Sequence, residues 1–120
     1  MLPYKHRLGK NYLKKTYSEG KKFRGEFGML VVRKVDSGPV KFAYVVSKKT
    51  GNAVQRHHLT RLLREITREV IKEYNFGYLP YHCQYVAFKY CKDYNEIKNE
   101  YSKQIKDAFG YTKDSGITTN

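Results

Sequence analysis

The sequence contains little that would support a disulfide, a metal site or a membrane segment. Its two cysteines, Cys83 and Cys91, lie in one predicted strand at a separation of roughly 26 Å. A disulfide needs Cα atoms within about 7 Å of each other, and two cysteines alone do not suggest a zinc site. No run approaches the roughly 18 to 20 consecutive apolar residues of a membrane helix, and residues 1–5 lack the apolar core of a signal peptide. We therefore expect a soluble, cytoplasmic protein that does not contact membranes.

Sequence signatures of enzymatic sites are also missing. The chain has no paired-carboxylate metal motif, no phosphate-binding glycine loop of the Walker type and no H-x-x-x-H zinc spacing. These absences argue against an independent enzyme and predict neither catalytic side chains nor a metal site in the polypeptide.

Acidic residues are scarce in the first half of the chain. Residues 1–64 contain 16 Lys and Arg but only Glu19, Glu26 and Asp36, whereas residues 65–120 contain eight of each sign. The whole net charge of +13 therefore belongs to the first half. Self-repulsion of this size is tolerated where a polyanion binds, so we expect nucleic acid first and an anionic membrane surface second.

The chain is long enough for one small domain, and 40% hydrophobic and 15% aromatic residues are enough to build its core. We expect a single domain over residues 1–111 and a flexible tail over 112–120. Periodicity and turn residues predict helices over Leu8–Glu19, Ala53–Tyr74 and Asp93–Phe109, and strands over Phe27–Val35, Val40–Ser47 and Tyr81–Tyr90, with a further short strand near Lys22–Gly25. The predicted fold class is α+β, a two-layer sandwich of three helices on a sheet of about four strands.

The turn residues Asp36-Ser37-Gly38-Pro39 predict that the first two long strands form an antiparallel hairpin. Alternation places one set of side chains on one face and the intervening set on the other. In the first strand, Phe27, Met29 and Val31 share one face, and Gly28, Leu30 and Val32 share the other. In the second strand, Phe42, Tyr44 and Val46 share one face, and Lys41, Ala43 and Val45 share the other. Both faces are largely apolar, so we expect both to be covered at least in part.

The helix predicted over Ala53–Tyr74 carries a row of arginines. An apolar stripe of Leu59, Leu62, Leu63, Ile66 and Val70 lies nearly opposite Arg61, Arg64 and Arg68, which fall within an arc of roughly 60°, and Arg56 lies one turn earlier. Guanidinium groups bind phosphate through paired planar donors. The alternative is a solvated face in which Glu65 and Glu69 pair with the arginines along the helix. The basic first half of the chain favours RNA binding.

The loop Lys48-Lys49-Thr50-Gly51-Asn52 leads into this helix. Backbone N–H groups at the helix start, the two lysines and the Asn52 side chain are placed to meet one anion, while Asn52 is also a typical N-cap. Both roles are compatible.

His57 and His58 lie near the start of this predicted helix. Adjacent helical residues diverge by about 100°, so the two imidazoles are poorly placed to act on one phosphate, although His6 or His82 could supply a partner. We expect His57 and His58 to hydrogen-bond to RNA or stack on it.

Aromatic residues are interleaved with the basic residues of the first half. They match the composition of a platform for single-stranded bases, although aromatics at strand spacing are more often core residues. The residues concerned are Tyr12, Tyr17, Phe23, Phe27 and Tyr44.

The segment SKKTGNAVQRHHLTRLLRE, residues 47–65, closely resembles the signature of the protein component of bacterial ribonuclease P. That pattern reads S-K-K-x-G-N-A-V-x-R-N-R-x-K-R-x-x-R-E. The matching residues are Ser47, Lys48, Lys49, Gly51, Asn52, Ala53, Val54, Arg56, Arg61, Arg64 and Glu65. The resemblance extends to about Phe109 and implies an α/β sandwich with a β-α-β unit of left-handed crossover, an exception to the usual hand.

The resemblance implies a protein that assists a catalytic RNA. The RNA subunit, with Mg²⁺, removes the 5′ leader of precursor tRNA, so the expected partners are the ribonuclease P RNA and precursor tRNA, with no obligate protein partner. The predicted RNA-binding residues are Lys48, Lys49, Asn52, Arg56, His57, His58, Arg61, Arg64 and Arg68. Positions matching the leader-binding cleft, between the first helix and the sheet, are Leu13, Tyr17, Leu30 and Tyr44.

The chain departs from the family pattern at several of these positions. His57, His58 and Thr60 replace an Asn, an Arg and a Lys, and Leu13 and Leu30 stand where aromatics are common. Two rival functions remain: a general RNA-binding or ribosomal accessory protein, and a protein-only nuclease that uses His57 or His58.

Overall fold

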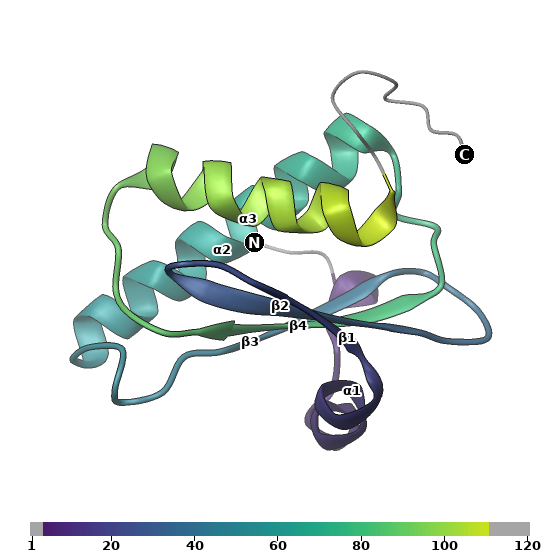
Figure 1. Ribbon diagram of the computed structural model, residues 1–120, viewed down its shortest axis with the longest axis horizontal. Coiled ribbons are helices and arrows are strands. Elements are labelled where there is room, and N and C mark those ends of the chain that lie inside the picture. Colours follow the sequence, from purple (N-terminus) through teal and green to yellow (C-terminus); the bar gives the residue numbers. More distant parts are fainter. Residues whose placement is uncertain (1–3, 111–120) are drawn as a thin grey trace.

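The computed structural model describes residues 4–110, so the predicted tail over 112–120 lies outside the described residues. Two short 3-10 turns open the chain. The elements, in chain order, are η1 Tyr4–His6, η2 Lys10–Tyr12, α1 Leu13–Glu19, β1 Lys21–Arg24, β2 Gly28–Lys34, β3 Lys41–Val45, α2 Ala53–Tyr74, β4 Tyr81–Ala87 and α3 Tyr94–Phe109 (Figure 1). No described helix is long and apolar enough to span a membrane.

The α+β class is confirmed: four strands form one mixed sheet in the order β1-β2-β4-β3. Neighbouring strands are antiparallel except β3 and β4, which are parallel. The chain segment β3-α2-β4 is therefore the β-α-β unit expected from the resemblance. Its left-handed crossover stays a prediction.

The predicted hairpin between the first two long strands is wrong, because β4 lies between β2 and β3. The segment after β2 pairs with the segment before β4 instead of folding back on itself: Val35 N–H donates to the Pro80 carbonyl at 2.9 Å, and Val40 N–H to the Gly77 carbonyl at 3.1 Å. The antiparallel hairpin of the fold is β1-β2, and it confirms the short strand predicted near Lys22–Gly25.

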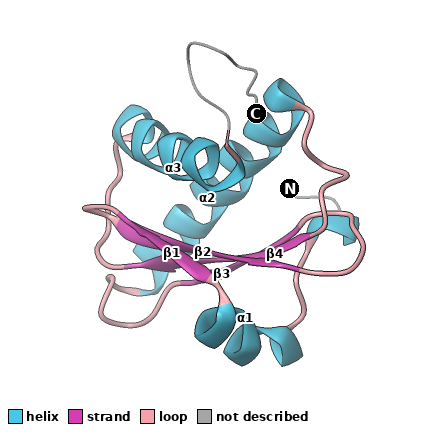
Figure 2. Cartoon of the chain, turned by 45° about the vertical axis from the view of Figure 1, so that its right-hand side comes forward, coloured by secondary structure: helices cyan, strands magenta, loops and turns pink. Residues whose placement is uncertain are grey.

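The helices cover the two faces of the sheet unequally. α2 and α3 pack together over one face, and the shorter α1 lies under the other (Figures 1 and 2). We call these the core face and the α1 face. The core face contributes Leu30, Phe42 and Tyr85 to the main hydrophobic cluster. Because α1 lies on the other face, both faces of the sheet are covered, as the apolar alternation predicts.

Helix α2 has the bounds that the sequence predicts, and its ends explain why. Asn52 accepts a hydrogen bond from Gln55 N–H at 2.8 Å, and the Gln55 side chain accepts one from Asn52 N–H at 3.0 Å, which closes a capping box. Asn75 ends the helix in the left-handed conformation at φ 51°. Helix α1 begins five residues later than predicted, because Lys10–Tyr12 adopt a 3-10 turn and Tyr12 supplies no side-chain cap.

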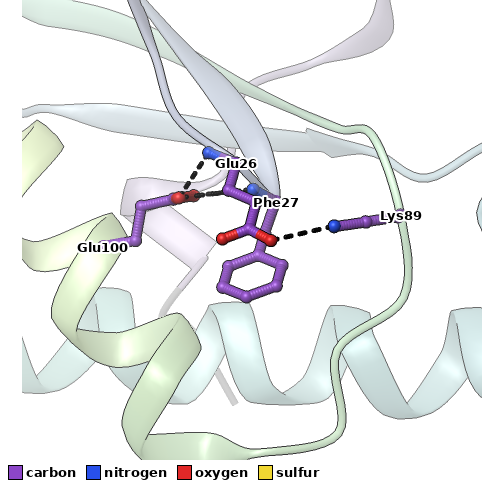
Figure 3. A network of polar contacts seen from close by, with 4 residues as sticks. All are labelled: Glu26, Phe27, Lys89 and Glu100. Atoms are coloured by element: carbon purple, nitrogen blue, oxygen red, sulfur yellow. Dashed lines mark hydrogen bonds and ion pairs between the residues drawn. The ribbon is translucent and has the colours of Figure 1, made fainter.

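Two polar networks connect the helices to the sheet. Glu100 on α3 accepts hydrogen bonds from the backbone N–H groups of Glu26 and Phe27 in the β1-β2 turn, and Glu26 pairs with Lys89 at 3.0 Å (Figure 3). On the core face, Thr67 of α2 contacts two tyrosine hydroxyl groups, discussed below. The first network fixes the turn of β1-β2 against α3.

Candidate nucleic-acid interface

Three arginines of α2 form an exposed row, which we call the arginine row: Arg61, Arg64 and Arg68. Within residues 4–110 none of them makes an ion pair or a hydrogen bond with another side chain or backbone group. Together with His57 and Glu65 they line a pocket of about 390 Å³. Guanidinium groups without internal partners are free to bind an external anion.

The acidic residues Glu65 and Glu69 of α2 form no ion pair with this row. Glu69 accepts a hydrogen bond from the Tyr94 hydroxyl at 2.7 Å and pairs with Lys98 at 3.1 Å, both on α3. The Tyr94 hydrogen bond lowers the pKa of the Glu69 carboxyl. Glu65 makes no ion pair with any described cation. The alternative, in which both glutamates pair with the arginines along the helix, therefore does not hold.

The loop before α2 presents Lys48 and Lys49 to solvent. Asn52 serves as N-cap through Oδ1, which leaves its amide nitrogen for an external acceptor. Arg56 is half-buried and folds back, donating from Nε to the Gly51 carbonyl at 3.2 Å. This places Arg56 beside the loop rather than in the exposed row, and its contact holds the loop against the first turn of α2.

The four histidines do not form a catalytic pair in this structure. His57 and His58 are exposed, and the His58 ring meets Tyr90 edge-on with centroids 6.2 Å apart. His6 is buried and donates from Nδ1 to the Val40 carbonyl at 2.7 Å. His82 lies under η2, with its ring 5.1 Å from that of Tyr12.

Two of the residues predicted for the leader cleft lie beside the α1 face. Leu13 is half-buried at the start of α1, and Tyr17 is 45% exposed, with the Lys22 ammonium 4.6 Å from its ring centre. An exposed aromatic ring beside a lysine can stack a base and hold its phosphate.

Leu30 does not lie in that cleft, so its prediction is wrong. Its side chain is fully buried in the cluster on the core face. The neighbours Met29 and Val31 lie on the α1 face, because side chains alternate along a strand, and Val31 Cγ1 lies beside Gly20 at the end of α1. Val31 is the β2 residue that the sequence alternation could have placed there.

Tyr44 also lies on the core face, and its place in the leader cleft stays a prediction. Its hydroxyl donates to Thr67 Oγ1 at 2.7 Å, and burial raises the pKa of this phenol. Its ring nevertheless borders a pocket of about 310 Å³ at the outer edge of β3, shared with Leu13, Lys10 and Arg64. This pocket lies between the arginine row and the start of α1.

The floor of the α1 face contains polar atoms that sequence reasoning missed. Thr16 Oγ1, His82 Nδ1 and Gln84 Oε1 are buried and have no hydrogen-bond partner within residues 4–110. Burial lowers the pKa of His82, and the charges of Arg33 and Lys41 lower it further. Alternation along Tyr81–Ala87 was the available signal, since it puts His82 and Gln84 on one face.

The fold and the site define a class of protein: a small α+β domain in which a helix with an exposed row of arginines packs above a mixed sheet. The family model for ribonuclease P matches residues 2–109. The chain therefore belongs to the ribonuclease P protein family.

Individual relatives agree with this assignment. The ribonuclease P protein component of Kocuria rhizophila is 34% identical over 74 residues, which cover 61% of this chain and 66% of that protein, just under two thirds of its length. The ribonuclease P protein from Thermotoga maritima has the same fold, with a TM-score of 0.69 at 22% identity over 84% of this chain and 96% of that one. The ribonuclease P protein from Staphylococcus aureus matches with a TM-score of 0.67 at 25% identity, over 90% of this chain and 92% of that one.

Proposed function

We propose that this chain is the accessory subunit of a cytoplasmic ribonuclease P and binds its catalytic RNA and precursor tRNA. The observation that carries the proposal is the arginine row. Three guanidinium groups lie exposed and unpaired among the described residues, while Glu69 of the same helix is held by α3. Lys48 and Lys49 add charge at the start of the helix. RNA backbone phosphates are the ligands that such a surface fits best.

The 5′ leader is assigned to the opposite side of the sheet. A single strand that leaves the arginine row reaches the pocket at the edge of β3, where Leu13 and the Tyr44 ring offer apolar contacts and Lys10 offers charge. Beyond it, the exposed Tyr17 ring with Lys22 can stack the next base. Fewer aromatic rings line this path than the family pattern has, so we expect weak preference for leader sequence.

The chemistry of cleavage is assigned to the RNA subunit. We expect Mg²⁺ on RNA and substrate phosphates, while the protein contributes by neutralising charge and positioning the leader.

The decisive experiment measures cleavage of precursor tRNA at low Mg²⁺ concentration with the full-length protein alone, with a bacterial ribonuclease P RNA alone, and with both. The proposal predicts that cleavage requires both or is much faster with both. Cleavage by the protein alone would indicate a protein nuclease, and His57 and His58 would be the residues to replace. Binding of RNA without any stimulation would indicate a general RNA-binding protein.

A further inference from the structure

A third basic pocket lies at the C-terminal end of α2, on no part of the surface assigned above. It measures about 730 Å³ and is lined by Lys5 and His6 of η1, Pro39, and Lys72, Asn75 and Tyr78 at and after the end of α2. No residue of the arginine row or of the β3 edge pocket lines it.

The lining has the groups needed to bind a nucleotide. Lys5 and Lys72 are exposed and make no ion pair with another described residue, and no carboxylate lines the pocket. Tyr78 is 68% exposed, which leaves its ring free to stack. A site with two cations, one free aromatic ring and no acid favours a phosphorylated base.

His6 supplies a polar atom at the inner wall. Its Nδ1 donates to the Val40 carbonyl at 2.7 Å, which fixes the ring with Nε2 toward Gly77, another residue of the pocket lining. When Nδ1 carries the proton of a neutral imidazole, Nε2 is a hydrogen-bond acceptor. Nε2 can then accept from a base N–H or a ribose hydroxyl group.

The pocket continues the cationic face of α2. At 100° per residue, Lys72 falls within an arc of roughly 80° that also contains Arg61, Arg64 and Arg68, and it lies about 16 Å along the axis from Arg61. The arginine row and Lys72 therefore lie along one side of α2.

We propose that this pocket binds one nucleotide of a single-stranded RNA that continues along α2, with its phosphate between Lys5 and Lys72 and its base on the Tyr78 ring. The proposal rests on the RNA-binding function proposed above and adds a contact site at the far end of the helix. The competing explanation is structural: Lys72 lies in the last turn of α2, where a cation stabilises the helix dipole. That role predicts a change in stability and none in RNA affinity.

The test compares Lys72→Ala and Tyr78→Ala in the full-length protein with Lys103→Ala, a matched loss of charge on the outer surface of α3, where Lys103 pairs with Asp107 at 3.3 Å. The probe is a fluorescently labelled single-stranded RNA long enough to follow α2. We expect Tyr78→Ala to weaken binding at least about fivefold, because loss of a stacked base costs on the order of 1 kcal/mol or more. Lys72→Ala should reduce the salt dependence, log Kd against log salt, by about 0.7. Lys103→Ala should change neither.

The outcomes separate this inference from the proposed function. If Tyr78→Ala and Lys72→Ala fold like the parent by circular dichroism and keep its affinity and salt dependence, the pocket does not bind RNA, although the accessory function stands. Equal weakening by Lys103→Ala would also overturn the inference. Binding of a nucleoside monophosphate that is lost in Tyr78→Ala, with unchanged RNA affinity, would assign the pocket to free nucleotides and overturn it. If the parent protein neither binds RNA nor stimulates cleavage, the proposed function itself fails.

Discussion

At the residue scale, the buried hydroxyl group of Thr67 contacts three other polar groups. Its hydroxyl donates to the Leu63 carbonyl at 2.7 Å and accepts from Tyr44, so its remaining contact, 2.8 Å to the Tyr101 hydroxyl, must be donated by Tyr101. Burial raises the pKa of both phenols. One hydroxyl group therefore satisfies a tyrosine from β3 and another from α3, and joins both elements to α2.

Replacing Thr67 by Val keeps the shape and removes the acceptor. We expect Thr67→Val to lower the free energy of unfolding by about 1 to 3 kcal/mol for each tyrosine hydroxyl left unpaired. Thr67→Ser is the control, because it keeps the hydroxyl and loses only a methyl group, at about 1 kcal/mol. Urea unfolding measures both. A Val variant as stable as the parent protein would show that the network adds nothing to stability.

Glu69 gives a pH prediction with a definite sign. The Tyr94 hydrogen bond holds the pKa of Glu69 below its ordinary value of 4.5 in the folded state. Because the folded-state pKa is the lower one, this interaction stabilises the protein above pH 4.5, and the contribution is lost as pH falls through the folded-state value. Tyr94→Phe should raise the Glu69 pKa, measured by NMR titration of the carboxyl group. An unchanged titration would mean that the Lys98 and Arg68 charges set the shift.

At the scale of elements, α2 is the helix to which we assign most of the proposed RNA contacts. Replacing Arg61 or Arg64 by Ala should weaken RNA binding by about 1 to 3 kcal/mol. Each replacement should also reduce the slope of log Kd against log salt by the amount expected for about one phosphate contact. Because both side chains are exposed and unpaired among the described residues, the stability of the fold should not change. Unchanged affinity of both variants at low salt would show that another face of α2 binds RNA.

Tyr17 of α1 and Leu30 of β2 lie on opposite sides of the sheet, so we expect their replacement to have different effects. Tyr17→Ala should weaken binding of precursor tRNA by about 1 to 3 kcal/mol and leave binding of mature tRNA, which lacks the leader, unchanged. Leu30→Ala should instead destabilise the fold by about 2 to 5 kcal/mol, because Leu30 is fully buried on the core face. Paired binding and unfolding measurements test both. Equal effects of Tyr17→Ala on the two tRNAs would remove Tyr17 from the leader site.

The accuracy of sequence prediction differs between elements for physical reasons. α2 could be predicted to the residue because its apolar stripe, its Asn52 cap and its Asn75 end are all local signals. The order of strands in a sheet depends on residues far apart in the sequence. β4 lies between β2 and β3, and the residues of the Asp36–Pro39 turn carry no information about a strand that begins at Tyr81. The same limit affected the cleft. Alternation separates Leu30 from Val31 correctly, but only the packing of α1 and α2 shows which of them faces the leader side.

At the scale of the whole molecule, most of the cations that line the pockets assigned to RNA belong to the basic first half of the chain, and Arg68 and Lys72 belong to the second half. The cationic residues that line the three pockets assigned to RNA all lie between Lys5 and Lys72. Two acids of the second half form ion pairs with cations of α3, Glu69 with Lys98 and Asp107 with Lys103. Glu65, in contrast, lines the pocket of the arginine row.

The excess of positive charge predicts opposite effects of salt on stability and on binding. A net charge of +13 on 120 residues destabilises the free protein by self-repulsion, and added salt screens that repulsion, so its melting temperature should rise between about 0.01 and 0.3 M salt. Over the same range the affinity for RNA should fall, because counterion release drives binding. Circular dichroism melts and RNA binding in one salt series measure both trends. A melting temperature that falls with salt would show that the four ion pairs of the described residues outweigh the repulsion, and the excess charge would then need no RNA partner to explain it.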